Sequence, residues 1–271
     1  VALQVDSLRD YDILNEKIHV TIDKDFKTAT YIIEYHIKSD HIGIQIPLLF
    51  YAENYKSNFK VWVDDDSVEL KSISSAFLTT AKSPYSRFSS SVSPPSYKGD
   101  SENITIMWSE NVGHSYSFTD LKYFKADLSK GEHIIRVTYI GDVSVTEQYK
   151  GNEHSFIYSL SPARHWRSFG TLEITLDATQ YTKEFSTNLG NQATGKLDSI
   201  ATWSFNKLPA DYFSIFYFQK IDKPERIDYS MVEEVLNSSK YSYEKGIIIG
   251  VIIILLILLV FLRIRKQRKN K

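Results

Sequence analysis

The segment SPARHWR, residues 161–167, is the strongest candidate for a binding site in this chain. Arg164 and Arg167 carry planar guanidinium groups, which can grip a carboxylate or a phosphate with paired hydrogen bonds. His165 adds a titratable ring, and Trp166 adds an indole that can stack on a sugar or a peptide. In the alternative interpretation, Trp166 fills the core at the end of a strand and both arginines are solvated. Arg164, His165, Trp166 and Arg167 are therefore candidate ligand-binding residues.

Other residue patterns point away from catalysis. The seven histidines lack the spacing of a zinc site, and the absence of Cys excludes disulfides, thiolate zinc sites and Cys nucleophiles. Asp64-Asp65-Asp66 lacks the spacing of a calcium loop and stands between two strand-like runs, so it predicts a hairpin turn. Phosphate-binding glycine loops and dinucleotide fingerprints are also missing. We expect no metal, no cofactor and no enzymatic activity.

The run Tyr212–Tyr217, YFSIFY, offers aromatic groups on both faces of one strand. One face is expected to pack inward. The other either packs on a neighbouring lobe or binds a protein or glycan partner.

Short segments of alternating apolar residues recur through residues 1–225 and are separated by turn residues. They are rich in β-branched and aromatic side chains, which fit a pleated, half-buried surface. The pattern predicts an all-β fold, an antiparallel β-sandwich. The expected strands are 17–22, 30–37, 59–63, 104–108, 133–139, 155–160, 172–176, 201–205 and 213–218.

The β-rich region is long enough for one large sandwich or two packed ones. We favour a first lobe over residues 1–140 and a second over residues 154–225. Residues 83–96, SPYSRFSSSVSPPS, are rich in Ser and Pro and are expected to be a surface loop, because Pro94-Pro95 cannot lie in a central strand.

The C-terminal region has a different character. Residues 246–262, GIIIGVIIILLILLVFL, contain no charged or strongly polar side chain and predict a single transmembrane helix. Residues 228–245 before it begin with an amphipathic pattern and predict a juxtamembrane helix. Gly246 and Gly250 have the Gly-x-x-x-Gly spacing that permits weak helix self-association.

The last nine residues, 263–271, form a basic tail that orients the chain in the bilayer. Without them the chain has 26 Lys and Arg against 33 Asp and Glu, so the remainder is acidic, which argues against nucleic-acid binding. Basic residues beside a span stay in the cytoplasm. The membrane-orienting residues are Arg263, Arg265, Lys266, Arg268, Lys269 and Lys271.

This orientation places the β-rich ectodomain in the periplasm or outside the cell, with a signal peptide already removed. In the competing arrangement, a tail-anchored protein keeps the main domain in the cytosol and places the basic tail on the opposite side of the membrane.

Residues 155–218 contain a series of spaced aromatic, aliphatic, Gly and Pro positions: Tyr158-x-Leu160-x-Pro162, Trp166, Gly170, Leu172-x-Ile174, Trp203-x-Phe205, Pro209 and Phe213-x-Ile215-x-Tyr217. This stretch resembles uncharacterised bacterial envelope β-sandwich families. It implies a structural motif and brings no catalytic residue.

These observations favour a membrane-anchored extracytoplasmic β-sandwich protein that acts as a binding or assembly module. Its expected partners are the lipid bilayer and a protein or glycan outside it. Two alternatives stay open: an accessory subunit of a membrane complex, and an envelope hydrolase that cleaves glycans or peptides with paired carboxylates.

Overall fold

The computed structural model describes residues 2–3, 11–72, 89–93, 103–109, 112–148, 150–190 and 200–221. The chain divides into two units, Val1–Ile221 and Asp222–Lys271, and every described residue belongs to the first. The predicted segments 228–245, 246–262 and 263–271 therefore lie outside the described residues, as do Gly246 and Gly250. Among the described residues, no helix has the length and apolar character needed to cross a membrane.

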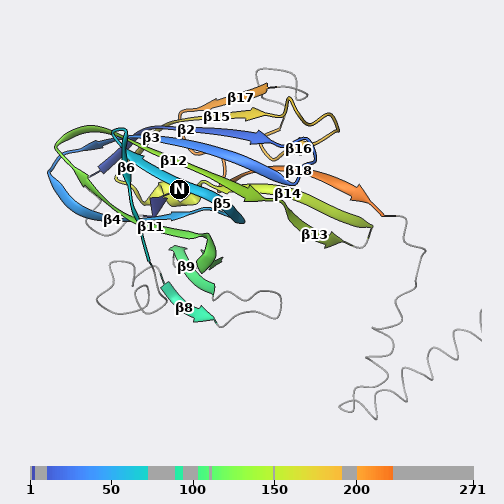
Figure 1. Ribbon diagram of the computed structural model, residues 1–271, viewed down its shortest axis with the longest axis horizontal. Helices are drawn as coiled ribbons and strands as arrows, with labels where there is room; N and C mark the ends of the chain where they lie inside the picture. Colours follow the sequence, from blue (N-terminus) through green and yellow to red (C-terminus); the bar gives the residue numbers. More distant parts are fainter. Residues whose placement is uncertain are drawn as a thin grey trace, which may run out of the picture. The chain divides into compact units, whose positions relative to one another are not determined.

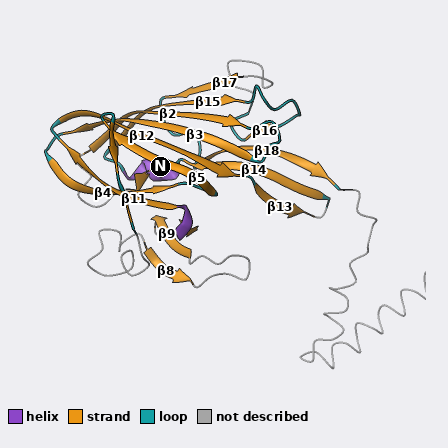
Figure 2. Cartoon of the chain, in the orientation of Figure 1, coloured by secondary structure: helices purple, strands orange, loops and turns teal. Residues whose placement is uncertain are grey.

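Strands dominate the described residues, and their only helical elements are two 3-10 helices, η2 (Phe118–Asp120) and η3 (Ser161–His165) (Figure 2). Alternation drives strand formation: in β3 (Thr28–Ser39) every second side chain from Ala29 to Ile37 is buried. Each of the nine expected strands coincides with an observed one, apart from Leu160 at the end of its segment. The all-β prediction is confirmed for this part of the chain.

The strands form four sheets (Figure 1). The largest has the order β17-β15-β2-β3-β12-β5-β6, in which β3 is joined by β2 (Tyr11–Ile22), β5 (Tyr55–Val63), β6 (Asp66–Val68), β12 (Gly131–Asp142), β15 (Ser168–Asp177) and β17 (Ile200–Phe205). The second sheet contains β1 (Ala2–Leu3), β4 (Gly43–Tyr51), β11 (Leu121–Leu128) and β7 (Leu70–Lys71), in that order. The third contains β13 (Ser144–Gln148), β14 (Gly151–Ser159), β18 (Tyr212–Lys220) and β16 (Ser186–Thr187), and the fourth β10 (Val112–Ser117), β9 (Asn103–Ser109) and β8 (Ser89–Ser93).

The two four-stranded sheets share one hydrophobic core with the inner face of the seven-stranded sheet. Phe50 on β4 contacts Tyr139 on β12, with ring centroids 5.9 Å apart. Trp203 on β17 contacts Phe213 on β18 at 5.7 Å. One four-stranded sheet therefore covers the β5–β12 side of the large sheet and the other covers the β17 side, which makes a two-layer sandwich.

Two details depart from the predicted antiparallel sandwich. Among the described strands, all pairs are antiparallel except β2 with β15, which run parallel from Asp12–Ser168 to Thr21–Asp177. The long chain between these strands provides the crossover that parallel neighbours require. The same pairing places strands from residues 11–142 and strands from residues 168–205 in one sheet. The predicted lobes 1–140 and 154–225 therefore share this sheet.

The expected surface loop at residues 83–96 is wrong in part. Its residues Ser89–Ser93 form β8, which pairs with β9 at the edge of the three-stranded sheet, and the rest of the segment lies outside the described residues. Ladder hydrogen bonds come from the backbone, so a serine-rich sequence can pair when a neighbouring strand offers its edge. The strand ends directly before Pro94, as the missing N–H of proline requires.

A β-bulge at Leu14 sets which side chains of β2 face the core. Ile13 pairs with Ile37 and Asn15 with His36, so Leu14 has no partner on β3. The extra residue shifts the alternation, and both Ile13 and Glu16 point inward. Gly170 on β15 lies against this bulge, where an added Cβ would be 2.1 Å from the Leu14 carbonyl oxygen.

Gly170→Ala should therefore destabilise the protein by about 1–3 kcal/mol, because the backbone of β2 or β15 must move to admit a methyl group. Urea unfolding measures the change. Thr171→Ala is the matched control: it removes only an exposed hydrogen bond to Asn15 and should cost less than about 1 kcal/mol. Equal losses in the two variants would contradict the role of the bulge.

Candidate binding site at the sandwich corner

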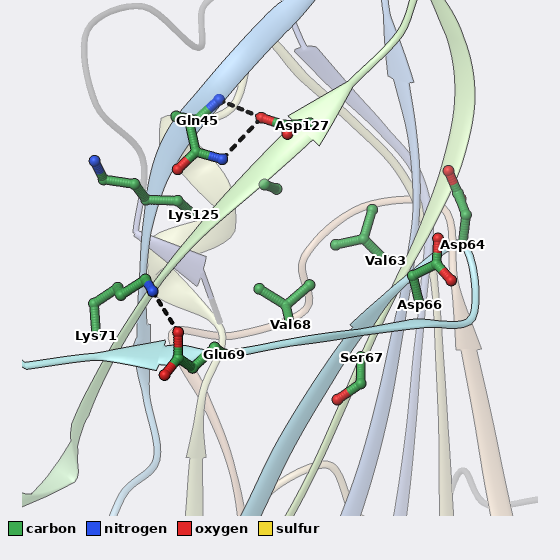
Figure 3. A pocket seen from close by; sticks show the side chains of 11 residues that line it. Gln45, Val63, Asp64, Asp66, Ser67, Val68, Glu69, Lys71, Lys125 and Asp127 are labelled. Atoms are coloured by element: carbon green, nitrogen blue, oxygen red, sulfur yellow. Dashed lines mark hydrogen bonds and ion pairs between the residues drawn. The ribbon is translucent and has the colours of Figure 1, made fainter.

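A pocket of about 390 Å³ lies where the β5–β6 edge of the seven-stranded sheet approaches β4, β11 and β7 (Figure 3). We call it the corner pocket. Figure 3 shows Val63 and Val68 in the middle of the lining, with Lys71 and Lys125 on one side and Asp64 and Asp66 on the other. The lining residues are Gln45, Val63, Asp64, Asp66, Ser67, Val68, Glu69, Lys71, Lys125, Ala126 and Asp127.

A tight hairpin builds one wall of the corner pocket. Val63 pairs with Asp66, so only Asp64 and Asp65 form the turn between β5 and β6. Both have positive φ angles, 50° and 70°, as a type I′ turn requires. Aspartate tolerates this left-handed region better than most residues, which explains its use where glycine is absent. The predicted hairpin turn at Asp64-Asp65-Asp66 is confirmed.

Asp64 also holds a nearly buried histidine. His133, only 6% exposed, has Nδ1 at 2.5 Å from Asp64 Oδ2 and Nε2 at 2.9 Å from the Ser129 carbonyl oxygen. Both partners are acceptors, so the ring fits this site best with a proton on each nitrogen. Burial alone lowers the pKa of His133, but the hydrogen bonds with Asp64 and Ser129 outweigh it and raise the pKa above the ordinary value.

The same contact acts on the carboxylate of Asp64. Partial burial raises the pKa of Asp64, but hydrogen bonds from His133 and the Ile134 N–H dominate and lower it. The result is an ion pair that ties the β5–β6 turn to the start of β12.

With two exceptions, the other charged groups of the pocket each have a partner within the domain. Asp127 accepts hydrogen bonds from the Gln45 backbone N–H at 2.5 Å and from its side-chain amide at 3.1 Å. Lys71 lies 2.5 Å from Glu69, and this contact lowers the pKa of Glu69. Gln45 has a positive φ of 54°, and backbone strain of this kind is typical of ligand sites.

Asp66 and Lys125 differ from these neighbours, because the side chain of neither forms a hydrogen bond or ion pair with another described residue. The pocket thus offers a free carboxylate and a free ammonium above an apolar floor of Val63, Val68 and Ala126. Such a site can bind a small ligand that carries both a positive and a negative group. Within the described ranges, no three His, Asp or Glu side chains are grouped to hold a metal ion.

In the structure, the SPARHWR residues connect neighbouring elements of the domain through core packing and salt bridges. Trp166 is 5% exposed and belongs to the core, so its ring offers no open stacking surface. Arg164 pairs with Asp211 at 2.6 Å. Arg167 pairs with Asp12 and Asp40, and its hydrogen bonds hold the pKa of Asp12 at about 2. His165 ends η3.

In the YFSIFY run, Phe213 and Ile215 are buried, as predicted for the inward face. On the other face Tyr212 is 48% exposed and Phe216 is half-buried. Tyr217 lies on the inward face, where its ring stacks on His154 at a centroid distance of 4.6 Å.

A carboxyl group lies in the core away from both of these regions. Glu16 is fully buried, and its Oε1 accepts a hydrogen bond from the Tyr158 hydroxyl at 3.0 Å. The Tyr158 hydroxyl is 2.8 Å from that of Tyr35. Glu16 Oε2 has no hydrogen-bond partner in the part of the chain that the structure describes. Burial raises the pKa of Glu16 to about 7, although the tyrosine hydroxyls act in the opposite direction.

Sequence reasoning missed both the corner pocket and Glu16. For Glu16 a signal exists, since it shares the two-residue period of Ile18, Val20 and Ile22 and so falls on the buried face. The corner pocket has no such signal, because Gln45, Asp66 and Lys125 come from three strands whose proximity depends on the sheet packing.

No family model matches the chain, and no curated protein matches it. It is similar in part to yeast leukotriene A4 (LTA4) hydrolase in complex with bestatin, at 6% identity and a TM-score of 0.43, over 79% of this chain and 30% of that one. It is also similar to an M1 zinc metallopeptidase from Deinococcus radiodurans, at 10% identity and a TM-score of 0.36, over 77% of this chain and 42% of that one. The chain thus spans less than half the length of either protein, and so loose a likeness supports no conclusion about activity.

Asp64→Asn should lower the pKa of His133, because an amide cannot stabilise the imidazolium as a carboxylate does. A raised histidine pKa stabilises the fold at low pH, and this contribution disappears as the pH rises through the folded-state pKa. The variant should therefore lose about 1 kcal/mol near pH 6 and less near pH 9. NMR titration of the His133 ring and urea unfolding measure the two effects. Asp65→Asn, at an 87% exposed side chain, is the control and should leave the His133 titration unchanged.

Stability should also fall as the pH rises from about 5 to about 7, because the folded state retains a proton on Glu16 that the unfolded chain releases near its ordinary pKa of 4.5. Glu16→Gln should reduce this fall by about 2–4 kcal/mol, measured as unfolding free energies at pH 5 and pH 8. Glu53→Gln is the comparison, since burial and the charge of Asp120 raise the pKa of Glu53 to about 7 as well. An unchanged pH dependence in Glu16→Gln would show that Glu16 is ionised in the fold.

Proposed function

We propose that this protein is a membrane-anchored extracytoplasmic β-sandwich that acts as a binding or assembly module. The observation that carries the proposal is the sequence after the described unit: an apolar run at residues 246–262 followed directly by nine residues of which six are basic. The described unit ends at Ile221, which leaves residues 222–245 as the connection to this anchor. A helix at residues 228–245 would lead into the membrane.

The corner pocket supports the binding part of the proposal. Its lining residues lie at and beside the edge strands of two sheets, and behind them β5 pairs with β12, which pairs with β3 over twelve consecutive positions. The pocket leaves Asp66 and Lys125 unpaired while its other charged groups are paired within the domain. Binding residues are commonly carried at the loops and edges of a rigid scaffold, which is where this pocket lies.

The arrangement predicts which positions of the chain can be reached from outside the cell. Because the chain has no Cys, single cysteines report accessibility directly. We expect a membrane-impermeant maleimide to label Ser67→Cys in the corner pocket, after permeabilisation of an outer membrane where the cell has one. Lys271→Cys in the basic tail should be labelled only after lysis.

Ala52→Cys is the matched control, since residue 52 is fully buried and should react only in the unfolded chain. Labelling of Lys271→Cys but not of Ser67→Cys in intact cells would overturn the orientation and indicate a tail-anchored cytosolic domain.

A further inference from the structure

Among the described residues, the edge of β18 is only partly covered by another strand. β14 pairs with β18 along its whole length, from Tyr212 to Lys220. On the opposite side β16 pairs only with Ile215 and Phe216. In the described part of the chain, the ladder between β16 and β18 therefore ends at Phe216. β18 continues for four more residues.

The backbone of Phe218 points to this uncovered side. The Ile221 N–H donates to the Lys150 carbonyl on the β14 side, and the Asn188 N–H donates to the Ser214 carbonyl on the β16 side. Backbone groups of successive residues in a strand point alternately to its two sides. Phe218 and Lys220 are in phase with Ser214, so their N–H and C=O groups face the open edge.

A groove of about 550 Å³ lies along the same edge, and we call it the edge groove. On one side are Phe216, Tyr217 and Phe218 of β18 with Glu153 of β14, and on the other are residues 182–186, which lead into β16. Phe218 is 46% exposed, and Gln219 and Lys220 are exposed as well. The volume is in the range of about 300–1,000 Å³ that is usual for ligand sites.

We propose that the edge groove binds an extended peptide segment of a partner protein, which adds to the sheet as a strand beside Phe218 and Lys220. The edge offers two N–H and two C=O groups in register with an existing ladder, and an extended polypeptide is the ligand that presents matching groups at the same spacing. The proposal rests on the proposed function and deepens it, because it names the partner class of a binding module.

The side chains around the groove define what the peptide should carry. Side chains on one face of an added strand would lie over Phe216 and Phe218, which favours a large apolar residue there. Side chains on the other face would lie near Tyr217, which is held by His154 and by an edge-to-face contact with Phe26 at 4.8 Å. Proline should be excluded at positions whose N–H faces β18.

The test uses the purified full chain and random heptapeptides displayed on phage. Selected peptides are synthesised, and their affinities are measured by fluorescence anisotropy. Phe218→Pro removes an N–H that faces the open edge rather than β14, so the β14–β18 ladder stays intact. Phe218→Ala is the matched control, because it removes the same ring and keeps the N–H.

We expect selected peptides to bind Phe218→Pro at least about tenfold more weakly than Phe218→Ala, with both variants retaining the wild-type melting temperature within a few degrees. N-methylation of alternate peptide amides should weaken binding to the wild-type chain to a similar extent, while methylation of the intervening amides should not.

Several results would overturn the proposal: no enriched sequence, equal binding by the proline and alanine variants, or indifference to N-methylation, which would indicate a side-chain or glycan site. A concentration-dependent dimer that Phe218→Pro abolishes would identify a second copy as the occupant instead. Because binding is measured on purified protein, failure here is separate from failure of the topology experiment.

Discussion

The parallel pairing of β15 with β2 is the interaction on which the rest of the domain depends. It brings together residues 156 positions apart, such as Asn15 and Thr171, and joins β15 and β17 to the strands that precede them. Without this pairing the seven-stranded sheet would end at β2, and the inner faces of β14 and β18 would lose Trp203 as a packing partner. The salt bridge between Asp12 and Arg167 lies at one end of the same pairing and ties η3 to β2.

This pairing also explains an unusual feature of the core. The bulge at Leu14 fits against β15 only because residue 170 is glycine, and the bulge turns Glu16 inward. A carboxyl group in an apolar core is costly in its charged form, so the fold holds it with Tyr158 and retains its proton up to about pH 7. The backbone bulge at Leu14 and the protonation of Glu16 in the core are thus coupled within β2.

The two candidate sites, the corner pocket and the edge groove, both lie where a sheet ends. The corner pocket is formed where β6, the last strand of the large sheet, leads into β7 of another sheet. The edge groove is formed where β16 stops short of the end of β18. In the middle of a sheet the backbone groups of a strand are shared between its two neighbouring strands, whereas at an edge the outward-facing groups remain available for a partner.

Local pattern alone was enough to identify nine of the strands, because the two-residue period of side chains such as Tyr31, Ile33 and Tyr35 reports a buried face directly, but it did not identify β4 or β11. The same holds for the turn at Asp64-Asp65 and for the apolar run at residues 246–262, which are properties of consecutive residues. Strand order, the parallel pair and the pairing of Ser89–Ser93 depend on which edges meet in three dimensions. Tertiary structure also decided that Trp166 is buried and that Arg164 and Arg167 are neutralised by Asp211, Asp12 and Asp40, since those acids are remote in sequence. The pattern of consecutive residues in the sequence determines which face each strand can bury. Only the packing of the sheets determines which charged side chains find partners and which, like Asp66 and Lys125, remain free.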